Sequence, residues 1–386
     1  MRRREHLISA ALVLSGFVGC VGQSSLQSGS HRNPVETPSD IQYQHDERNS
    51  GVTRAQLPSQ KSIRWQTELP RLSSGIAVAN DRVICAGSKL YALDAQTGDI
   101  EWTANPAHSF GRFPAIAGNT VYVTTWSGGS NWLRGLVALS LEDGSERWRV
   151  SPSAHFATPP TIANDTIYVT GDVGYRDVRA FDRTDGTQKW LFRAHPGTTA
   201  PAVANGMVFV GGGKEPPMYA LDAETGDEAW QFAPGYGGSS VAPTAAGNNV
   251  YIAWRWYLYE LDPTDGTERW RTRFDSQVRA PVASTGDSIY VPTSKALIAL
   301  DTDGNEQWSV PLRGGRYAPT VAGDSILIAD RHDAICLDAT DGTEFWRQAA
   351  VRDGRHTGIS GEPGVADETV YIPSDSGDVR AITQPE

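Results

Sequence analysis

Cysteine is scarce in this 386-residue chain, which contains only Cys20, Cys85 and Cys336. Cys20 belongs to an N-terminal leader rather than to the folded part of the chain. Cys85 and Cys336 fall in the first and seventh of the eight sequence repeats described below, and the eighth repeat would separate them in a closed ring. We therefore expect two buried thiols and no disulfide.

Basic residues are also few. Lys and Arg number 34 against 45 Asp and Glu, which gives a formal net charge of −11, and removal of residues 1–19, with three arginines and one glutamate, would make it −13. A nucleic-acid binder needs a clustered basic face, so no nucleic-acid partner is expected. The acidic, lysine-poor composition favours a high-salt environment, and we expect the source to be a halophilic archaeon.

One motif dominates the chain and first appears at Leu90 to Trp102 as LYALDAQTGDIEW. Its core pattern is Ala-x-Asp-x-x-Thr/Asp-Gly-x-x-x-Trp. Later variants occupy Leu136 to Trp148, Val178 to Trp190, Met218 to Trp230, Leu258 to Trp270, Leu297 to Trp308 and Ile335 to Trp346. Counted from Trp65, the tryptophan spacings are 37, 46, 42, 40, 40, 38 and 38 residues, the period of a four-stranded propeller blade. Eight tryptophans in register predict eight blades.

Each part of the motif has a physical role. The alternating apolar run before the turn predicts a strand. Asp94 to Gly98 predicts a tight turn, because Gly tolerates positive φ and Asp bonds to its own backbone. Most copies also have a small residue before the turn: Ala92, Ala138, Ala180, Ala220, Ala299 and Ala381. We expect each indole to dock against the neighbouring blade, and its truncation to cost roughly 3–5 kcal/mol.

A second motif precedes each of these hairpins. Its first clear copy is Pro114 to Val123, and relatives begin at Pro160, Pro201, Pro243, Pro281, Pro319 and Pro363. Asn205-Gly206 and its counterparts are turn signals between two short apolar strands. The first blade departs from the pattern, with Gly75 in place of proline. Together the two motifs predict four antiparallel strands in each blade.

The two chain ends complete each other's motif. The strand Ser62 to Thr67 contains Trp65 without a preceding Ala-x-Asp, whereas Val379 to Ile382 has no following tryptophan. We predict an all-β, eight-bladed propeller in which the N-terminal strand is the outer strand of the C-terminal blade. Such closure leaves no long unpaired edge between the first and last blades.

The N-terminus has the features of an export signal. Residues 1–20 have a basic start, an apolar run of about a dozen residues, which is too short to span a membrane, and a small residue before Cys20. Arg3 to Leu7 resembles a twin-arginine (Tat) motif and Val18 to Cys20 a lipobox, so we expect a lipoprotein anchored through Cys20 to the outer face of the cytoplasmic membrane. An uncleaved anchor with an incidental cysteine is the alternative. Residues 21–40 are expected to form a flexible tether, and residues 41–386 the propeller, with Ile41 to Pro58 wrapping one of its faces.

From about Ile41 to Ile382 the chain resembles the pyrroloquinoline quinone-like (PQQ) repeat propellers, because both motifs recur along this whole region. That family includes quinoprotein dehydrogenases and non-catalytic members such as the outer-membrane assembly propeller lipoprotein. The resemblance implies the fold but not the cofactor. The dehydrogenases use two adjacent cysteines, an Asp base and a calcium or lanthanide ion, and this shorter chain has no adjacent cysteines. We therefore assign no catalytic residue, no metal ligand and no cofactor, with PQQ as the alternative.

Sequence variation is confined to one face of the expected propeller. If the strands of a blade are A to D from the inside outwards, the A–B and C–D turns are short and stereotyped, whereas the B–C turns and D–A connections vary, and binding sites concentrate in such loops. The D–A connections supply channel-mouth candidates, one per blade: Arg71, Arg112, His155, His195, Tyr236, Arg279, Arg316 and His356. The B–C turns supply partner-surface candidates, mainly Trp and Arg: Trp126, Trp132, Arg134, Tyr175, Trp254, Arg255, Trp256 and Arg331.

These side chains suggest recognition rather than chemistry. A cationic ring at the channel mouth would attract anions or an acidic partner segment, and Trp, Tyr and Arg are enriched in interface hot spots. Alternatively, the same residues pair with local carboxylates or simply cap the propeller. We favour a membrane-tethered, non-catalytic scaffold that is monomeric and binds a protein partner at the cell surface. The alternatives are a PQQ-dependent oxidoreductase and a sensor of a small anion or glycan.

Overall fold

The computed structural model describes residues 40–70, 72–105, 113–125, 135–150, 156, 158–171, 177–193, 199–211, 218–235 and 241–385. All of these belong to the compact unit Thr37–Glu386. Their regular elements are strands only, so the all-β prediction is confirmed. Nowhere in this part of the chain is there a helix of the length and apolarity needed to cross a bilayer.

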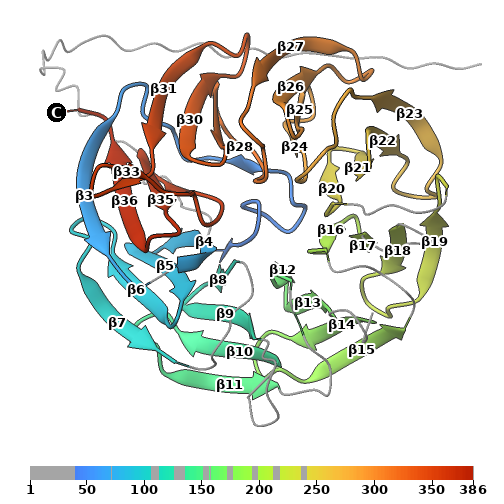
Figure 1. The fold of residues 1–386 in the computed structure, drawn as a ribbon. Coiled ribbons are helices and arrows are strands. Elements are labelled where there is room, and N and C mark those ends of the chain that lie inside the picture. Colours follow the sequence, from blue (N-terminus) through green and yellow to red (C-terminus); the bar gives the residue numbers. More distant parts are fainter. Residues whose placement is uncertain are drawn as a thin grey trace, which may run out of the picture. The chain divides into compact units, whose positions relative to one another are not determined.

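Eight antiparallel sheets form the ring of Figure 1, so the predicted propeller with eight blades is confirmed. Blade 1 contains β4 (Leu72–Ala79), β5 (Arg82–Gly87), β6 (Leu90–Asp94) and β7 (Ile100–Ala104). Blade 2 contains β8 (Ala115–Ala117), β9 (Thr120–Thr125), β10 (Gly135–Ser140) and β11 (Glu146–Val150). Blade 3 contains β12 (Thr161–Ala163), β13 (Thr166–Thr170), β14 (Asp177–Asp182) and β15 (Gln188–Arg193). Blade 4 contains β16 (Ala202–Ala204), β17 (Met207–Gly211), β18 (Met218–Asp222) and β19 (Glu228–Phe232).

The remaining blades continue this order around the ring. Blade 5 contains β20 (Thr244–Ala246), β21 (Asn249–Trp254), β22 (Tyr257–Leu261) and β23 (Glu268–Arg273). Blade 6 contains β24 (Ala283–Ser284), β25 (Ile289–Pro292), β26 (Ala296–Leu300) and β27 (Glu306–Pro311). Blade 7 contains β28 (Thr320–Ala322), β29 (Ser325–Ala329), β30 (Asp333–Asp338) and β31 (Glu344–Ala349). Blade 8 contains β34 (Gly364–Ala366), β35 (Thr369–Pro373), β36 (Asp378–Thr383) and, from the other end of the sequence, β3 (Ser62–Glu68).

Blade 8 closes the ring as predicted. Strand β3 pairs with β36, and Trp65 lies opposite Ala381 in that register. The same cross-strand pair recurs at Trp102 and Ala92 in blade 1, and the pairing shifts by one residue beside it. Because an N-terminal and a C-terminal strand share one sheet, opening the ring requires the loss of all hydrogen bonds between β3 and β36.

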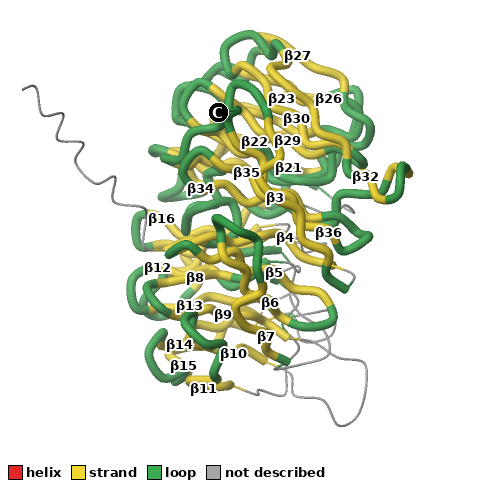
Figure 2. Tube along the Cα trace, turned by 90° about the vertical axis from the view of Figure 1, so that its left-hand side faces the viewer, coloured by secondary structure: helices red, strands yellow, loops and turns green. Residues whose placement is uncertain are grey.

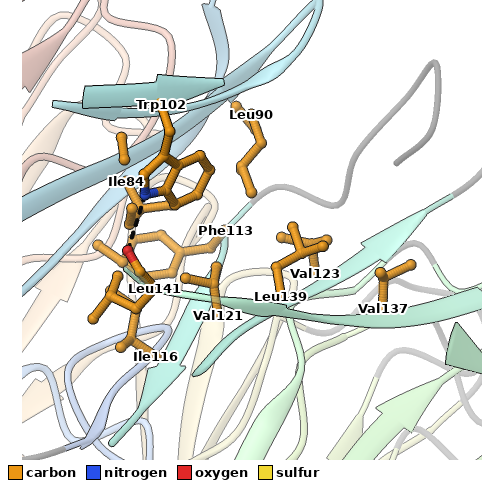
Figure 3. Packing of buried hydrophobic residues seen from close by; sticks show 13 residues of the cluster. Ile84, Leu90, Trp102, Phe113, Ile116, Val121, Val123, Val137, Leu139 and Leu141 are labelled. Atoms are coloured by element: carbon orange, nitrogen blue, oxygen red, sulfur yellow. Dashed lines mark hydrogen bonds between the residues drawn. The ribbon is translucent and has the colours of Figure 1, made fainter. Parts of the chain in front are cut away.

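Each tryptophan docks on the next blade rather than on its own. Trp102 of blade 1 is buried between blades 1 and 2, and its Nε1 donates a hydrogen bond to the Leu141 carbonyl at 2.9 Å (Figure 3). Trp190 of blade 3 donates in the same way to Ala223 of blade 4 at 3.0 Å. The indole therefore contributes both apolar surface and a satisfied polar group to these blade junctions.

A glycine in the neighbouring turn makes room for seven of the eight motif indoles. At Gly226 the φ angle is +78°, and an added Cβ would lie 2.6 Å from the Trp190 ring. The equivalent glycines of the other blades have the same relation to the preceding tryptophan: Gly98, Gly144, Gly186, Gly266, Gly304 and Gly342. Glycine is thus needed twice over, for the backbone conformation and for the close approach of the ring.

The junction between blades 7 and 8 is built differently, because the chain ends interrupt the C–D turn of blade 8. Here the Trp346 indole donates to the carbonyl of Pro58 at 2.6 Å. Ala55 and Leu57 pack against the same apolar cluster. The segment before β3 therefore replaces the missing turn.

The turn carboxylates are structural. Asp94 accepts hydrogen bonds from the backbone N–H groups of Gln96 and Thr97 at 2.8 and 2.7 Å, and these bonds keep its pKa below the usual value. In blade 5 the Thr264 hydroxyl and the Arg269 guanidinium lower the pKa of Asp262 to about 2. Much of the negative charge of the protein therefore belongs to the repeated turns on one face.

Residues 40–56 line the A–B end of the ring, where Figure 1 shows the blue segment inside it. We call this segment the plug. It contains β1 (Asp40–Ile41), which is antiparallel to β8, and β2 (Val52–Thr53), which is parallel to β28. Between them its carbonyls accept one N–H from each of four consecutive inner strands, from donors Val203, Ala245, Ser284 and Val321 at 2.6 to 2.8 Å. The inner strands would otherwise leave these N–H groups unpaired towards the axis.

Two plug side chains form hydrogen bonds with backbone groups of the blades. The Gln42 amide both accepts from the Ile162 N–H at 2.6 Å and donates to the Ile162 carbonyl at 2.9 Å. Asn49 is fully buried with a φ of +54°, and its Nδ2 donates to the Pro201 and Pro243 carbonyls at 3.0 and 3.1 Å. The predicted wrapping of one face is therefore seen, because the plug binds the inner strands at that end of the ring.

The two cysteines of the folded part are free and buried, as expected. Cys85 lies in β5, and Cys336 lies opposite Trp346 in blade 7, where blade 5 has Glu260 and the remaining six blades have alanine. Burial raises the pKa of each thiol to about 12, so both are unreactive.

We predict that Gly226→Ala destabilises the propeller by about 2 kcal/mol more than Gly206→Ala, because only the first substitution drives a methyl group into an indole. Gly206 is a matched control, since its φ is +75° and nothing lies within 4 Å of an added Cβ. Urea unfolding of both variants measures the difference. Equal losses of stability would show that the indole seat contributes nothing beyond the φ requirement.

We also predict that Asn49→Asp lowers the free energy of unfolding by about 3–5 kcal/mol, since it places a buried carboxylate against backbone carbonyls. Asn205→Asp is the control, because Asn205 has a similar φ of +52° in an exposed turn, and its expected effect is within about 0.5 kcal/mol. Thermal and urea unfolding report both. A tolerated Asn49→Asp would mean that the plug is not held by this side chain.

Candidate binding face

The face opposite the plug is formed by the B–C turns and the D–A connections. Backbone hydrogen bonds join them: the Val278 N–H donates to the Arg255 carbonyl at 3.1 Å, and the Leu312 N–H donates to the Lys295 carbonyl at 2.7 Å. Ile359 N–H likewise donates to the Arg331 carbonyl at 3.1 Å. Two of these connections also reach the next blade, through the bridges of Val278 with Thr293 and of Ile359 with Ser374, and the Tyr317 hydroxyl of the connection between blades 6 and 7 donates to the Ile359 carbonyl. The loops of blades 5 to 8 therefore form one continuous belt.

Many predicted site residues lie outside the described residues: Arg71, Arg112, His155, His195, Tyr236, Trp126, Trp132, Arg134 and Tyr175. The structure places Arg279, Arg316 and His356 of the channel-mouth candidates, all of which are exposed. Arg255, Trp256 and Arg331 of the partner-surface candidates are exposed as well. Blades 5 to 8 thus bring six predicted residues onto one face.

Trp254 is a correction to the predicted partner surface. It is the last residue of β21 and lies within the core between blades 4 and 5, with 4% of its surface exposed. Trp256, two residues later, is 39% exposed, and the Arg255 guanidinium lies 5.9 Å from its ring centroid. The strand continues one step further than the aromatic cluster suggested, so Trp254 stabilises the fold and only Trp256 is available to a partner.

The connection between blades 7 and 8 contains a hairpin that the sequence did not predict, β32 (Val351–Arg352) and β33 (Arg355–His356), which projects from the protein in Figure 2. Its base is fixed by Arg380, whose Nη1 donates to the Ala349 carbonyl at 2.9 Å and whose Nη2 donates to Val351. Arg352 adds an ion pair with Glu68 at 2.9 Å. The tip, residues 353–356, is exposed.

Buried carboxylates support the same sector. Asp330 is 1% exposed, and its Oδ1 accepts the N–H groups of His332 and Asp333 at 2.9 Å. Arg347 pairs with Asp333 at 3.1 Å and with Glu344 at 2.8 Å, and these contacts, that with Glu344 foremost, raise the pKa of the guanidinium. These groups hold the B–C turn of blade 7, so they are structural rather than reactive.

A cavity of about 580 Å³ opens beside the belt between blades 1, 7 and 8. Its lining includes the hydroxyls of Ser73, Ser88 and Ser360 and the carboxylate of Asp375. The Ser360 hydroxyl is buried without a hydrogen-bond partner among the described residues. Such a lining suits a small polar molecule rather than an apolar one.

The residues present do not fit the quinone chemistry of the PQQ dehydrogenases. Those enzymes place two adjacent cysteines over the cofactor, whereas Cys85 and Cys336 are buried in the strands of two different blades. The described ranges also contain no group of three His, Cys, Asp or Glu residues arranged to hold a metal ion. We derive no catalytic step on this face.

Comparison with known proteins agrees with the repeat architecture. The family described as outer membrane protein assembly factor BamB matches residues 49–135, 133–202, 218–320 and 295–385. No curated protein matches the chain in sequence.

Solved structures share the fold at low identity. BamB from Moraxella catarrhalis is 20% identical with a TM-score of 0.67, over 84% of this chain and 97% of its own. The quinohemoprotein alcohol dehydrogenase of Comamonas testosteroni is 14% identical with a TM-score of 0.73, over 90% and 81%. The enzyme ADHIIG of Pseudomonas putida HK5 is 14% identical with a TM-score of 0.71, over 91% and 82%. Structural similarity therefore spans both a membrane-assembly factor and enzymes, and by itself it shows the fold alone.

We predict that Arg380→Lys loosens the projecting hairpin without unfolding the ring, because one ammonium group cannot bond to all the acceptors that the guanidinium reaches. Amide hydrogen exchange at residues 351–356 should accelerate, with a global loss of about 1–2 kcal/mol. Arg355→Lys at the exposed tip is the control and should change neither. Identical exchange in the two variants would contradict the anchoring role of Arg380.

Proposed function

Because the chain belongs to the family of outer membrane protein assembly factor BamB, we propose that it is a non-catalytic scaffold, tethered outside the cytoplasmic membrane, that binds a protein partner. One observation carries the proposal. The plug and the stereotyped turns occupy one face of the ring, whereas the other presents a continuous belt of variable loops with exposed Trp256 and arginines. Side chains of the belt can be substituted without disturbing the packing between blades, so the belt is the part of the ring that we expect to recognise a partner.

The plug and the belt lie on opposite faces of the ring. Strand β1 begins at Asp40 and pairs with Ala117, beside the A–B turn of blade 2. The described chain therefore begins on the plug face, and the belt is left open to a partner.

A small-ligand sensor is the second candidate, and the 580 Å³ cavity favours it. Hydroxyls from Ser73, Ser88 and Ser360 together with the Asp375 carboxylate are groups that bind sugars and other polyols. This candidate differs from a scaffold in needing only the cavity, whereas a scaffold needs the belt.

The scaffold is tested by site-specific photo-crosslinking in the native host. A photoreactive residue at Trp256 or Arg331 should give a defined cross-linked partner, whereas the same residue at Asn205 or Asp265 on the plug face should not, because only the belt is proposed to bind. In the same cells Cys20→Ser should move the protein from the membrane fraction to the exported soluble fraction.

Two results would count against the scaffold. Cross-links only at Asn205 or Asp265 would assign binding to the wrong face. No cross-link at any position, together with a rise in melting temperature on addition of a monosaccharide or a small anion, would replace the scaffold by the sensor.

A further inference from the structure

The belt contains an uneven distribution of charge that the net charge of the protein conceals. Its exposed cationic side chains lie in the loops of blades 5 to 8, and we call them the cationic crescent: Arg255, Arg279, Lys295, Arg313, Arg316, Arg331 and Arg355. The exposed acidic residues of the same loops are fewer: Asp275, Asp353 and Asp375. A basic surface therefore occurs on a protein whose formal net charge is −11.

These cationic side chains differ from those of the repeat. Beside the motif tryptophans, Lys189 pairs with Asp182 at 3.4 Å, Arg269 with Asp262 at 2.7 Å, and other D-strand arginines with nearby glutamates. No member of the crescent forms an ion pair with any carboxylate in the described ranges. The repeat therefore neutralises its own cations locally, whereas the loops leave theirs available.

The crescent is spatially continuous because the belt is. Arg255 and Arg279 flank the Val278 hydrogen bond, and Lys295 and Arg313 flank the Leu312 hydrogen bond. The Tyr317 hydroxyl then donates to the Ile359 carbonyl at 2.7 Å, which joins the loop of Arg316 to that of Arg355. The charged groups thus follow one curved path over four blades.

We propose that the cationic crescent binds an extended acidic segment of a partner protein, an inference that rests on the scaffold function proposed above. Six of the seven residues are arginines, whose planar guanidinium groups bind carboxylates through two parallel hydrogen bonds. Trp256, beside Arg255, supplies an aromatic anchor at one end of the path.

Two other polyanions fit less well. A long nucleic acid would extend beyond the crescent, and the net charge of −11 of the protein would repel its phosphates. A flat anionic bilayer would first meet the tip of the projecting hairpin, where Asp353 lies near Arg355, and the hairpin would hold the bilayer away from the other members of the crescent. A short acidic peptide can instead follow a curved path.

The test measures binding of a fluorescein-labelled peptide of alternating Glu and Ser, twelve residues long, to the full exported chain by fluorescence anisotropy. Arg313→Glu/Arg331→Glu should weaken binding by about tenfold or more, because two attractive contacts become repulsive. The control is Arg54→Glu/Arg193→Glu, which changes the net charge equally at exposed arginines outside the crescent and should leave the affinity within about twofold. Raising NaCl from 0.05 to 0.5 M should weaken the wild-type complex.

Three results would overturn the proposal. Equal weakening in the crescent and control variants would show that only net charge matters. Stronger, crescent-dependent binding to phosphatidylglycerol vesicles, or to a twelve-nucleotide single-stranded DNA, would assign the surface to a membrane or a nucleic acid. If a partner is still cross-linked at Trp256 in the Arg313→Glu/Arg331→Glu variant, the scaffold function stands. The proposal that the crescent binds an acidic segment is then wrong.

Discussion

The contact between an indole and the turn glycine of the next blade, which occurs at seven of the eight blade junctions, is the interaction on which the ring depends. An isolated four-stranded sheet offers no surface on which its motif tryptophan can be buried. In the turn of the next blade, a side chain at the glycine position would collide with the indole ring. Tryptophan and glycine are therefore coupled between blades rather than within them. Because the eighth blade lacks an intact turn, Pro58 must supply its carbonyl, and this requirement fixes where the N-terminal segment runs.

That segment then determines which face can act. Once β1, Gln42, Asn49 and β2 have bound the inner strands, backbone groups at the plug end of the ring are paired, and the turn carboxylates there accept structural hydrogen bonds. The negative charge on this face comes from the aspartates that the turn motif repeats in each blade. The net charge of the chain consequently says little about the other face, where charge is set by loops outside the repeat.

The sequence predicted the periodic features of the ring in detail, whereas for the plug it predicted only that Ile41 to Pro58 wraps one face. Tryptophan spacing gave the number of blades, and the incomplete motifs at Trp65 and Ala381 gave the closure, because both depend on local patterns that recur. The hydrogen bonds of the plug join it to backbone groups that are far away in sequence, so no local pattern in residues 42–51 could predict them. Trp254 and Trp256 show the same limit for the site, since composition cannot tell which of two tryptophans ends a buried strand and which begins a turn.

The belt is held by main-chain hydrogen bonds, and this explains how a rigid surface can carry changeable side chains. The carbonyls of Arg255, Lys295 and Arg331 accept bonds that any residue could accept. Their side chains form no ion pair with any carboxylate of the described residues, and Arg255 instead lies over Trp256, whereas the guanidinium groups of Arg347 and Arg380 hold a turn and a hairpin in place. Because main-chain hydrogen bonds hold the belt, its side chains can be substituted, and its binding specificity changed, without disturbing the blades. This property is expected of a scaffold.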